Sequence, residues 1–412
     1  MLHLQLTGIN GEKGVMMKDL DIVVYGATGF TGRLCVEYLA ARRPDLKWAI
    51  AGRNGDKLAE VKQTTGANVE IIIAEADNVA ALQALAGRAK VVLSTAGPFH
   101  RYGSHLVAAC VKHATHYVDI TGENFWVKGL IEKHHAEAAR KGVRIIPSCG
   151  FDSIPSDLGS FFAIQKADQP IKRVESFHSY KGDASGGTLE TIFSMPDLNL
   201  GDDLTDPFLL NPTDTATPEM EKQSGDIFAI AAKSEINGYG APFIMAGANT
   251  RVVRRSAALW AQNQKPYGPD FVYQEFAFHP TRWRAFKGLM GIAAMGMVLF
   301  TPLRKLVRPL LKQPGEGPSE AERNAGWFDC KFILETQSGD KMVSAIRGDG
   351  DPGYKVTSKL VSECALCLLE DGDALPGGSN YGGVLTSASG LGMALVHRLS
   401  RSGIEFDEPR MT

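Results

Sequence analysis

Between Asp21 and Gly150, short runs of β-branched and other apolar residues alternate with stretches of helical periodicity. This alternation limits the fold more than any other feature, because it is the pattern of βαβ units whose strands lie parallel in one sheet. The strands that we expect span residues 21–25, 48–51, 69–73, 91–94, 117–120 and 143–146. Six such strands predict an α/β fold with a doubly wound parallel sheet of the Rossmann type.

The pattern changes after Pro155, where strand-like alternation is no longer separated by regular helices. The alternating runs cover residues 173–180, 271–278, 328–336 and 342–347, and helical patterns follow at 357–369 and 383–402. We therefore expect a second α+β domain on a mixed or antiparallel sheet. The expected division is an N-terminal extension (1–19), a Rossmann domain (20–155), a second domain for substrate or dimerisation (156–356) and C-terminal helices (357–412). Residues 196–218, rich in Asp and Pro, read as a loop that could cover a site.

The composition is that of an ordinary globular protein. The chain has 412 residues, of which 44% are apolar and 22% charged, with a formal net charge of −2. Such a chain can bury a core of about two domains, and it has no global positive field that would attract nucleic acid. The first 18 residues lack the apolar segment of a secretory signal, so we expect a cytoplasmic protein.

A glycine-rich turn follows the first expected strand, with the sequence Gly26-Ala-Thr-Gly-Phe-Thr-Gly32. At the start of a helix, such glycines let a pyrophosphate approach backbone N–H groups. The spacing is G-x-x-G-x-x-G and not the more common G-x-G-x-x-G. The motif indicates a dinucleotide site because it lies between a strand and a helix. The alternative is a glycine-rich turn without a ligand. The residues expected to hold the dinucleotide here are Gly26, Thr28, Gly29, Phe30, Thr31 and Gly32.

The second expected strand ends in Ala51-Gly-Arg53, where NAD-dependent enzymes usually carry an acid for the ribose 2′-hydroxyl. Arg53 can instead pair with a 2′-phosphate, which favours NADP(H) over NAD(H). A solvated loop arginine is the alternative. After the third strand, Asp77 is expected either to accept a hydrogen bond from the adenine amino group or to cap the next helix.

The fourth strand leads into a turn of small residues that marks the reaction side of the sheet. Ala96, Gly97, Pro98 and Phe99 would let the nicotinamide ribose lie against backbone. Polar groups follow this strand and the next two, among them Asp119, Thr121, Glu123 and Ser148. The candidate catalytic residues are His100, Tyr102 and Asp152, because a reductase needs a donor for the developing enolate or alkoxide. No Tyr-x-x-x-Lys pair follows the fourth strand.

The six cysteines are scattered, and Cys364 and Cys367 lie within an apolar helical pattern. A zinc site would need two further ligands nearby. We therefore expect buried thiols in a reducing compartment and no metal site.

The motifs as a set resemble the saccharopine dehydrogenase-like oxidoreductases, including the trans-acting enoyl reductases of bacterial lipid synthesis. The resemblance covers nearly the whole chain. It implies a Rossmann domain with a second α/β domain, and C-terminal helices that return to the Rossmann domain. Its landmarks are Gly26-Ala-Thr-Gly-Phe-Thr-Gly32, Ala51-Gly-Arg53, Ala96-Gly-Pro-Phe99, Tyr117-Val-Asp-Ile-Thr-Gly-Glu123, Cys149-Gly-Phe-Asp-Ser-Ile-Pro-Ser-Asp157, Gly317-Pro-Ser319, Gly326-Trp-Phe328 and Gly350-Asp-Pro-Gly-Tyr354.

An uncharged apolar segment, residues 288–303, is flanked by basic residues on both sides. It is short for a transmembrane helix, and Pro302 and Pro309 limit any longer one. The extended segment 288–312 is expected to be a peripheral membrane contact or a lid over an acyl chain. The alternative is a buried core helix or a homodimer interface.

Three functions are consistent with these features. The first is an NADP(H)-dependent oxidoreductase that reduces an enoyl or carbonyl group of a lipid-linked or apolar small molecule. The second is a saccharopine dehydrogenase-type amino-acid oxidoreductase, in which Arg251, Arg254 and Arg255 would hold the substrate carboxylates. The third is a non-enzymatic, lipid- or membrane-associated NADP(H)-binding protein.

Overall fold

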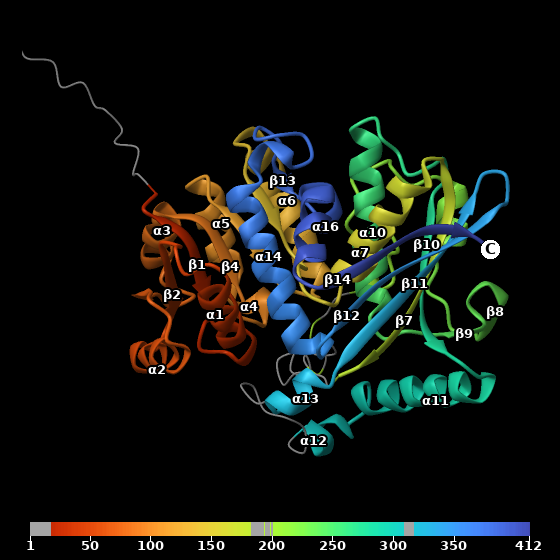
Figure 1. Cartoon of the computed structure of the whole chain (residues 1–412), viewed down its shortest axis with the longest axis horizontal. Coiled ribbons are helices and arrows are strands. Elements are labelled where there is room, and N and C mark those ends of the chain that lie inside the picture. Colours follow the sequence, from red (N-terminus) through yellow and green to blue (C-terminus); the bar gives the residue numbers. More distant parts are fainter. Residues whose placement is uncertain (1–17, 183–192, 194–197, 199–200, 309–316) are drawn as a thin grey trace, which may run out of the picture.

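Two seven-stranded sheets organise the molecule, and helices lie between and around them (Figure 1). The structure is a computed structural model that describes residues 18–182, 193, 198, 201–308 and 317–412. Most of the expected N-terminal extension, several residues of the 196–218 loop and the end of segment 288–312 lie outside the described residues.

The first sheet, sheet A, is parallel throughout and has the order β13-β6-β5-β4-β1-β2-β3. Its first six strands follow the doubly wound order 3-2-1-4-5-6. All six strands expected from the sequence are present, so the predicted fold class is confirmed. The strands are β1 (Leu20–Tyr25), β2 (Trp48–Gly52), β3 (Glu70–Ile73), β4 (Ala89–Ser94), β5 (His116–Asp119), β6 (Arg144–Ile146) and β13 (Gly383–Val384).

Both faces of sheet A are covered because successive side chains of a strand point to opposite faces. In β1, Ile22 and Val24 join the cluster that contains α1, α2 and α14, whereas Val23 and Tyr25 join the cluster that contains α3, α5 and α6. The covering helices are α1 (Phe30–Arg42), α2 (Gly55–Thr65), α3 (Val79–Arg88), α5 (Ser104–Lys112), α6 (Asn124–Arg140) and α14 (Thr357–Glu370), with the short α4 (Phe99–Tyr102) at the end of β4.

The second sheet, sheet B, is mixed and has the order β14-β12-β11-β7-β10-β9-β8. Strands β7 and β10 pair in parallel, and the other pairs are antiparallel. The four expected strands are confirmed as β7 (Ile171–Lys181), β10 (Val272–His279), β11 (Trp327–Thr336) and β12 (Lys341–Asp349), whereas β8 (Ala231–Lys233), β9 (Gly238–Ala241) and β14 (Ile404–Met411) were not expected.

Two long helices of this region also escape the sequence pattern, α7 (Ile154–Ala167) and α10 (Ala246–Gln262). Helix α10 lies in the crossover that the parallel pair β7 and β10 requires. Its buried face carries polar residues, including Asn249, Arg251 and Ser256, so no apolar stripe marks it. Helix α7 is buried nearly all round, which removes the amphipathic period.

The C-terminal region corrects one expectation. The helix expected over 383–402 is instead the edge strand β13, the short α15 (Ser387–Gly390) and α16 (Gly392–Arg401), separated where Gly392 adopts φ +52°. Strand β14 then completes sheet B. The remaining elements are η2 (Gly201–Leu204), α9 (Pro218–Gln223), η3 (Ser234–Ile236), α11 (Arg282–Leu299), α12 (Arg304–Val307), α13 (Glu320–Asn324), η5 (Pro352–Val356) and η6 (Gly372–Ala374).

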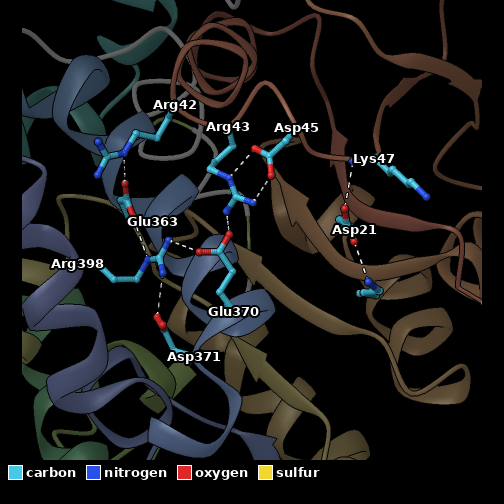
Figure 2. A network of polar contacts seen from close by, with 10 residues as sticks. Asp21, Arg42, Arg43, Asp45, Lys47, Glu363, Glu370, Asp371 and Arg398 are labelled. Carbon is cyan, nitrogen blue, oxygen red and sulfur yellow. Dashed lines mark hydrogen bonds and ion pairs between the residues drawn. The ribbon is translucent and has the colours of Figure 1, made fainter.

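The two sheets share one apolar core through α7 and α14, which contribute to the same cluster as strands of both sheets. Figure 2 shows the polar network that fastens α14 to its neighbours. The buried Glu363 carboxylate accepts from Tyr38 Oη at 2.6 Å and from Arg398 Nε at 3.1 Å. Since Tyr38 lies on α1 and Arg398 on α16, one carboxylate links three helices.

We expect Glu363→Ala to lower the free energy of unfolding by about 2 kcal/mol, because the Tyr38 hydroxyl and Arg398 Nε lose their shared acceptor, although Arg398 keeps its ion pairs with two other carboxylates. Urea unfolding at neutral pH measures the change. The control is Asp45→Ala, which removes the exposed partner of Arg43 and should have a much smaller effect. Equal losses for the two variants would contradict the role given to Glu363.

Candidate functional site

The turn after β1 has space for glycine alone at two of its three glycine positions. Gly26 adopts φ +86°, and a Cβ there would lie 2.8 Å from the backbone nitrogen of Ala96. A Cβ on Gly32 would lie 2.3 Å from the Gly26 carbonyl oxygen. Both glycines therefore permit close backbone approach within the turn.

Gly29 differs from its two neighbours. A Cβ at Gly29 would meet only the Gly26 carbonyl oxygen, at 3.3 Å, so a side chain there would point away from the protein. Gly29 is the N-cap of α1, provides no side-chain cap, and no acid occupies the first turn. The N-terminal N–H groups and the helix dipole can therefore receive an anion such as a pyrophosphate. Thr28 and Thr31 flank this position and are half-buried.

The Phe30 side chain has a packing role that the sequence did not reveal. Its ring makes an edge contact with Tyr354 at 4.5 Å between centroids, and the Arg323 guanidinium lies 5.5 Å from its centre. A Cβ on Gly317 would lie 2.5 Å from the same ring. The ring thus joins the turn to residues 317–354, and only its backbone remains at the helix N-terminus.

Arg53 and Asp77 lie in the loops after β2 and β3, and both are exposed. Burial raises the pKa of Tyr25 to about 12, with Asp77 and Glu75 adding to the rise and Arg53 opposing it, so these charges surround one phenol. Asn78, and not Asp77, caps α3 by accepting from Ala81 N at 3.1 Å. The cap alternative for Asp77 is therefore wrong, and its carboxylate remains on the surface beside the turn.

The turn after β4 packs directly on the turn after β1. Thr95 N donates to Tyr25 O at 2.9 Å, and Thr95 Oγ1 donates to Gly26 O at 3.1 Å. Residues Ala96 and Gly97 thus border the glycine-rich turn, and the Gly97–Pro98 peptide is cis. The ring of Phe99 is buried against Trp126, so Phe99 supports the turn from below.

His100 is held by a buried carboxylate at the start of α4. Its Nδ1 lies 2.7 Å from Glu123 Oε2, and the same carboxylate accepts from the backbone N–H groups of Phe99 and His100 at 2.9 and 2.8 Å. His100 Nε2 is buried and has no hydrogen-bond partner among the described residues. A carboxylate that accepts from Nδ1–H fixes the tautomer and orients the ring, as in a general acid–base pair.

Tyr102 and Asp152 occupy different surroundings. Tyr102 is 39% exposed at the end of α4. Asp152 follows β6, and desolvation, with a smaller effect of Glu275, raises the pKa of its carboxyl to about 6. Such a group holds its proton to higher pH than an ordinary carboxyl, as a general acid requires. The loop that carries Asp152 contacts the end of β5, where Ser148 N donates to Asp119 Oδ1 at 3.0 Å.

A buried polar network beside Asp152 was not expected from the sequence. Glu275 accepts from Asn249 Nδ2 at 2.7 Å and from Tyr273 Oη at 2.8 Å, and His178 Nε2 lies 3.6 Å from it. Ser153 Oγ continues the network to Asn249 Oδ1 at 3.1 Å. The signal was present in the strand patterns, because Glu275 shares the inward face of its strand with Phe271 and Tyr273.

The three arginines proposed to hold substrate carboxylates are engaged within the protein. Arg251 pairs with Asp226 at 2.6 Å. Arg254 donates to the carbonyl oxygens of Pro207 and Tyr273, and Arg255 donates to those of Leu210 and Val384. All three side chains are buried. That expectation is wrong in this structure, because the guanidinium groups instead anchor residues 205–210, which lie within the proposed loop.

Comparisons with known proteins agree with this geometry. Residues 22–146 match the family model described as the saccharopine dehydrogenase NADP binding domain. The yeast saccharopine dehydrogenase (L-Glu forming) from Saccharomyces cerevisiae superposes with a TM-score of 0.52 at 12% identity, covering 95% of this chain and 100% of that chain. That likeness shows a shared fold.

Two relatives are similar over nearly their full lengths. A protein of Mycobacterium tuberculosis H37Rv, provisionally named a trans-acting enoyl reductase, is 38% identical over 96% of this chain and 98% of its own. The trans-acting enoyl reductase of Mycobacterium leprae is 34% identical over 96% of this chain and 99% of its own. The chain therefore belongs to the saccharopine dehydrogenase-like family of NADP-dependent oxidoreductases, together with the trans-acting enoyl reductases.

Proposed function

We propose that the protein uses NADPH to reduce an enoyl or carbonyl group of an apolar, lipid-linked substrate. The observation that carries this proposal is the His100–Glu123 pair, which stands at the carboxyl edge of sheet A directly after the turn at residues 96–98. In doubly wound folds this edge is where the dinucleotide binds. The names of the relatives support enoyl reduction.

We assign the residues of the Rossmann region to the cofactor. The N-terminus of α1 at Gly29 would receive the pyrophosphate, Arg53 the 2′-phosphate and Asp77 the adenine amino group. Residues 96–98 would border the nicotinamide ribose. When bound, NADPH supplies the hydride. His100 would stabilise the negative charge that develops on the acceptor oxygen and would donate the one proton that completes the reduction, and Glu123 would hold the imidazole ring in position for that transfer.

Helix α11 supports the apolar character of the substrate and a peripheral membrane contact through residues 288–312. Of its residues only Ala285 is buried, so the core-helix alternative for this segment is wrong. Residues 156–356 are the proposed substrate region, and a homodimer through the same helix is the competing use of its surface. The amino-acid alternative is less favoured because Arg251, Arg254 and Arg255 are already paired.

The function is tested by incubating the protein with NADPH and a panel of enoyl thioesters, lipid-linked ketones and saccharopine. Absorbance of the reduced nicotinamide reports turnover. Oxidation of NADPH with the enoyl or ketone compounds supports the proposal, and turnover with saccharopine alone supports the amino-acid alternative. Cofactor binding without turnover on any compound would identify a non-enzymatic NADP(H)-binding protein.

Arg53 predicts a preference for the cofactor with the 2′-phosphate. Among the described residues it has no hydrogen-bond or ion-pair partner, so its guanidinium can pair with a phosphate. Arg53→Ala should weaken NADPH binding by about 10- to 100-fold and leave NADH binding nearly unchanged, given the usual strength of hydrogen bonds to charged groups. Calorimetry measures both affinities. Equal affinities of the unmodified protein for NADPH and NADH would remove this role.

Gly29 offers a test that separates binding from folding. Gly29→Val should abolish NADPH binding while the protein still folds, because the new side chain points into the space for the pyrophosphate. The control is Gly129→Val in α6, where an added Cβ meets nothing within 4 Å. Binding is followed by calorimetry and folding by circular dichroism. A folded Gly29→Val protein that binds NADPH normally shows that the pyrophosphate lies elsewhere.

The proton donor is distinguished by three variants. His100→Gln should lower kcat by about 10²- to 10⁴-fold with NADPH affinity retained, the usual range for loss of a general acid. Glu123→Gln should also lower kcat, because the His100 ring loses the carboxylate that orients it. Tyr102→Phe should have little effect. If instead Asp152→Asn removes activity and abolishes a pH limb near 6 while His100→Gln does not, Asp152 is the donor.

A further inference from the structure

Helix α11 and the short α12 that follows carry a large exposed apolar surface. Exposed fractions are 63% for Trp283, 72% for Phe300 and 71% for Leu306. Met290, Met297 and Leu303 are also exposed and belong to the same stretch. Monomeric proteins seldom expose apolar side chains in such continuity without a partner. We call residues 282–308 the docking segment.

The charged residues within this stretch of the sequence are all basic. Residues 280–315 contain no Asp or Glu, although the whole chain carries a formal net charge of −2. Lys287 Nζ lies 5.5 Å from the Trp283 ring, which stacks on Phe286. The basic residues of this stretch are Arg282, Arg284, Lys287, Arg304, Lys305, Arg308 and Lys312. An apolar helix with cations at both ends fits the interface of an anionic bilayer. The apolar side chains can pack among the acyl chains of the lipids, and the cations can pair with the anionic headgroups.

The docking segment is attached to the body along one side only. Ala285 is buried, and Gly288 lies against His279 of β10, where a Cβ would come within 2.8 Å of the imidazole. Figure 1 shows α11 lying outside sheet B, with α12 and α13 continuing along the same side of the molecule. The helix thus rests on the body and leaves its remaining surface outward. No helix among the described residues is both long and apolar enough to cross a membrane.

The chain that follows the docking segment returns to the glycine-rich turn. Gly317 lies against the Phe30 ring, and Arg323 lies over the same ring. The docking segment is therefore separated by fewer than ten residues of chain from a contact with the first residue of α1. A surface bound to lipid at α11 and α12 holds the cofactor edge of sheet A close to that lipid.

We propose that the docking segment binds the surface of membranes that contain anionic lipids, and that the enzyme takes its substrate from that bilayer. The second half of this inference rests on the proposed function, whereas the first half does not. A second copy of the chain is the competing occupant, but it would need acidic residues opposite these cations. An anionic bilayer supplies both apolar acyl chains and anionic headgroups.

The test is flotation of the full-length protein with vesicles of phosphatidylcholine alone or mixed with phosphatidylglycerol, at low and high salt. We expect binding to the mixed vesicles at low salt, weakened by high salt and by omission of the anionic lipid. The double variant Met297→Ser with Phe300→Ser, and the double variant Arg282→Glu with Lys305→Glu, should each lower the bound fraction tenfold or more. Phe228→Ser, which removes an exposed apolar residue elsewhere, should not change it.

Two outcomes overturn the docking inference. One is absence of the unmodified protein from the vesicle fraction at low salt, and the other is equal flotation of the variants. In the first case, dimerisation in light scattering that the Met297 and Phe300 variant abolishes would assign the surface to a second copy. Turnover on a short, water-soluble enoyl thioester is measured in parallel. Flotation without turnover supports the docking inference and contradicts the proposed function. Turnover without flotation supports the proposed function and contradicts the docking inference.

Discussion

The close approach of two turns at the carboxyl edge of sheet A is the constraint on which the rest of the site depends. The loop after β4 can contact the turn after β1 only because Gly26 has no side chain, since a Cβ there would lie 2.8 Å from Ala96 N. This contact leaves the N-terminus of α1 open and sets the start of α4 beside it. Glu123 then fastens α4 through two backbone N–H groups and the His100 ring. The close packing of these two backbone turns therefore determines where the proposed catalytic residue His100 lies.

The orientation of this edge depends in turn on a core that sheets A and B share. Helices α7 and α14 contribute to one apolar cluster with strands of both sheets, and the Glu363 network ties α14 to α1 and α16. A helix that carries the proposed phosphate site is thus fixed to the element that joins the sheets. Buried arginines fasten the other side, where Arg254 and Arg255 bond backbone carbonyls around residues 207–210. Substrate carboxylates would have to compete with these bonds.

The sequence predicted sheet A well because its buried strands are continuous apolar runs separated by regular helices. Sheet B was predicted in its four long strands but not at its edges. Strand β14 has few buried residues beyond Ile404 and contains Pro409, which an edge strand tolerates, so it lacks an alternating pattern. Helix α10 was hidden for a different reason. Residues 249–259 of this helix are buried on all sides and mix polar with apolar side chains, so the sequence has no apolar stripe at helical spacing.

The candidate site likewise has features that the sequence predicted and features that it did not. Glycine spacing and the basic residue at position 53 are local signals, and the sequence contained them. The partnership of His100 with Glu123 joins residues 23 positions apart, and that of Asp152 with Glu275 depends on how sheet B packs against the loop after β6. Contacts of that kind arise from tertiary packing, which single-residue patterns do not encode.

The most direct test of the account is an experimental structure of the protein with NADP⁺ bound. We expect the pyrophosphate at the N-terminus of α1 beside Gly29, the 2′-phosphate paired with Arg53, and the nicotinamide ring next to residues 96–98 with the His100 imidazole facing the same space. A nicotinamide ring on the far side of the sheet edge from His100, or a 2′-phosphate distant from Arg53, would contradict it.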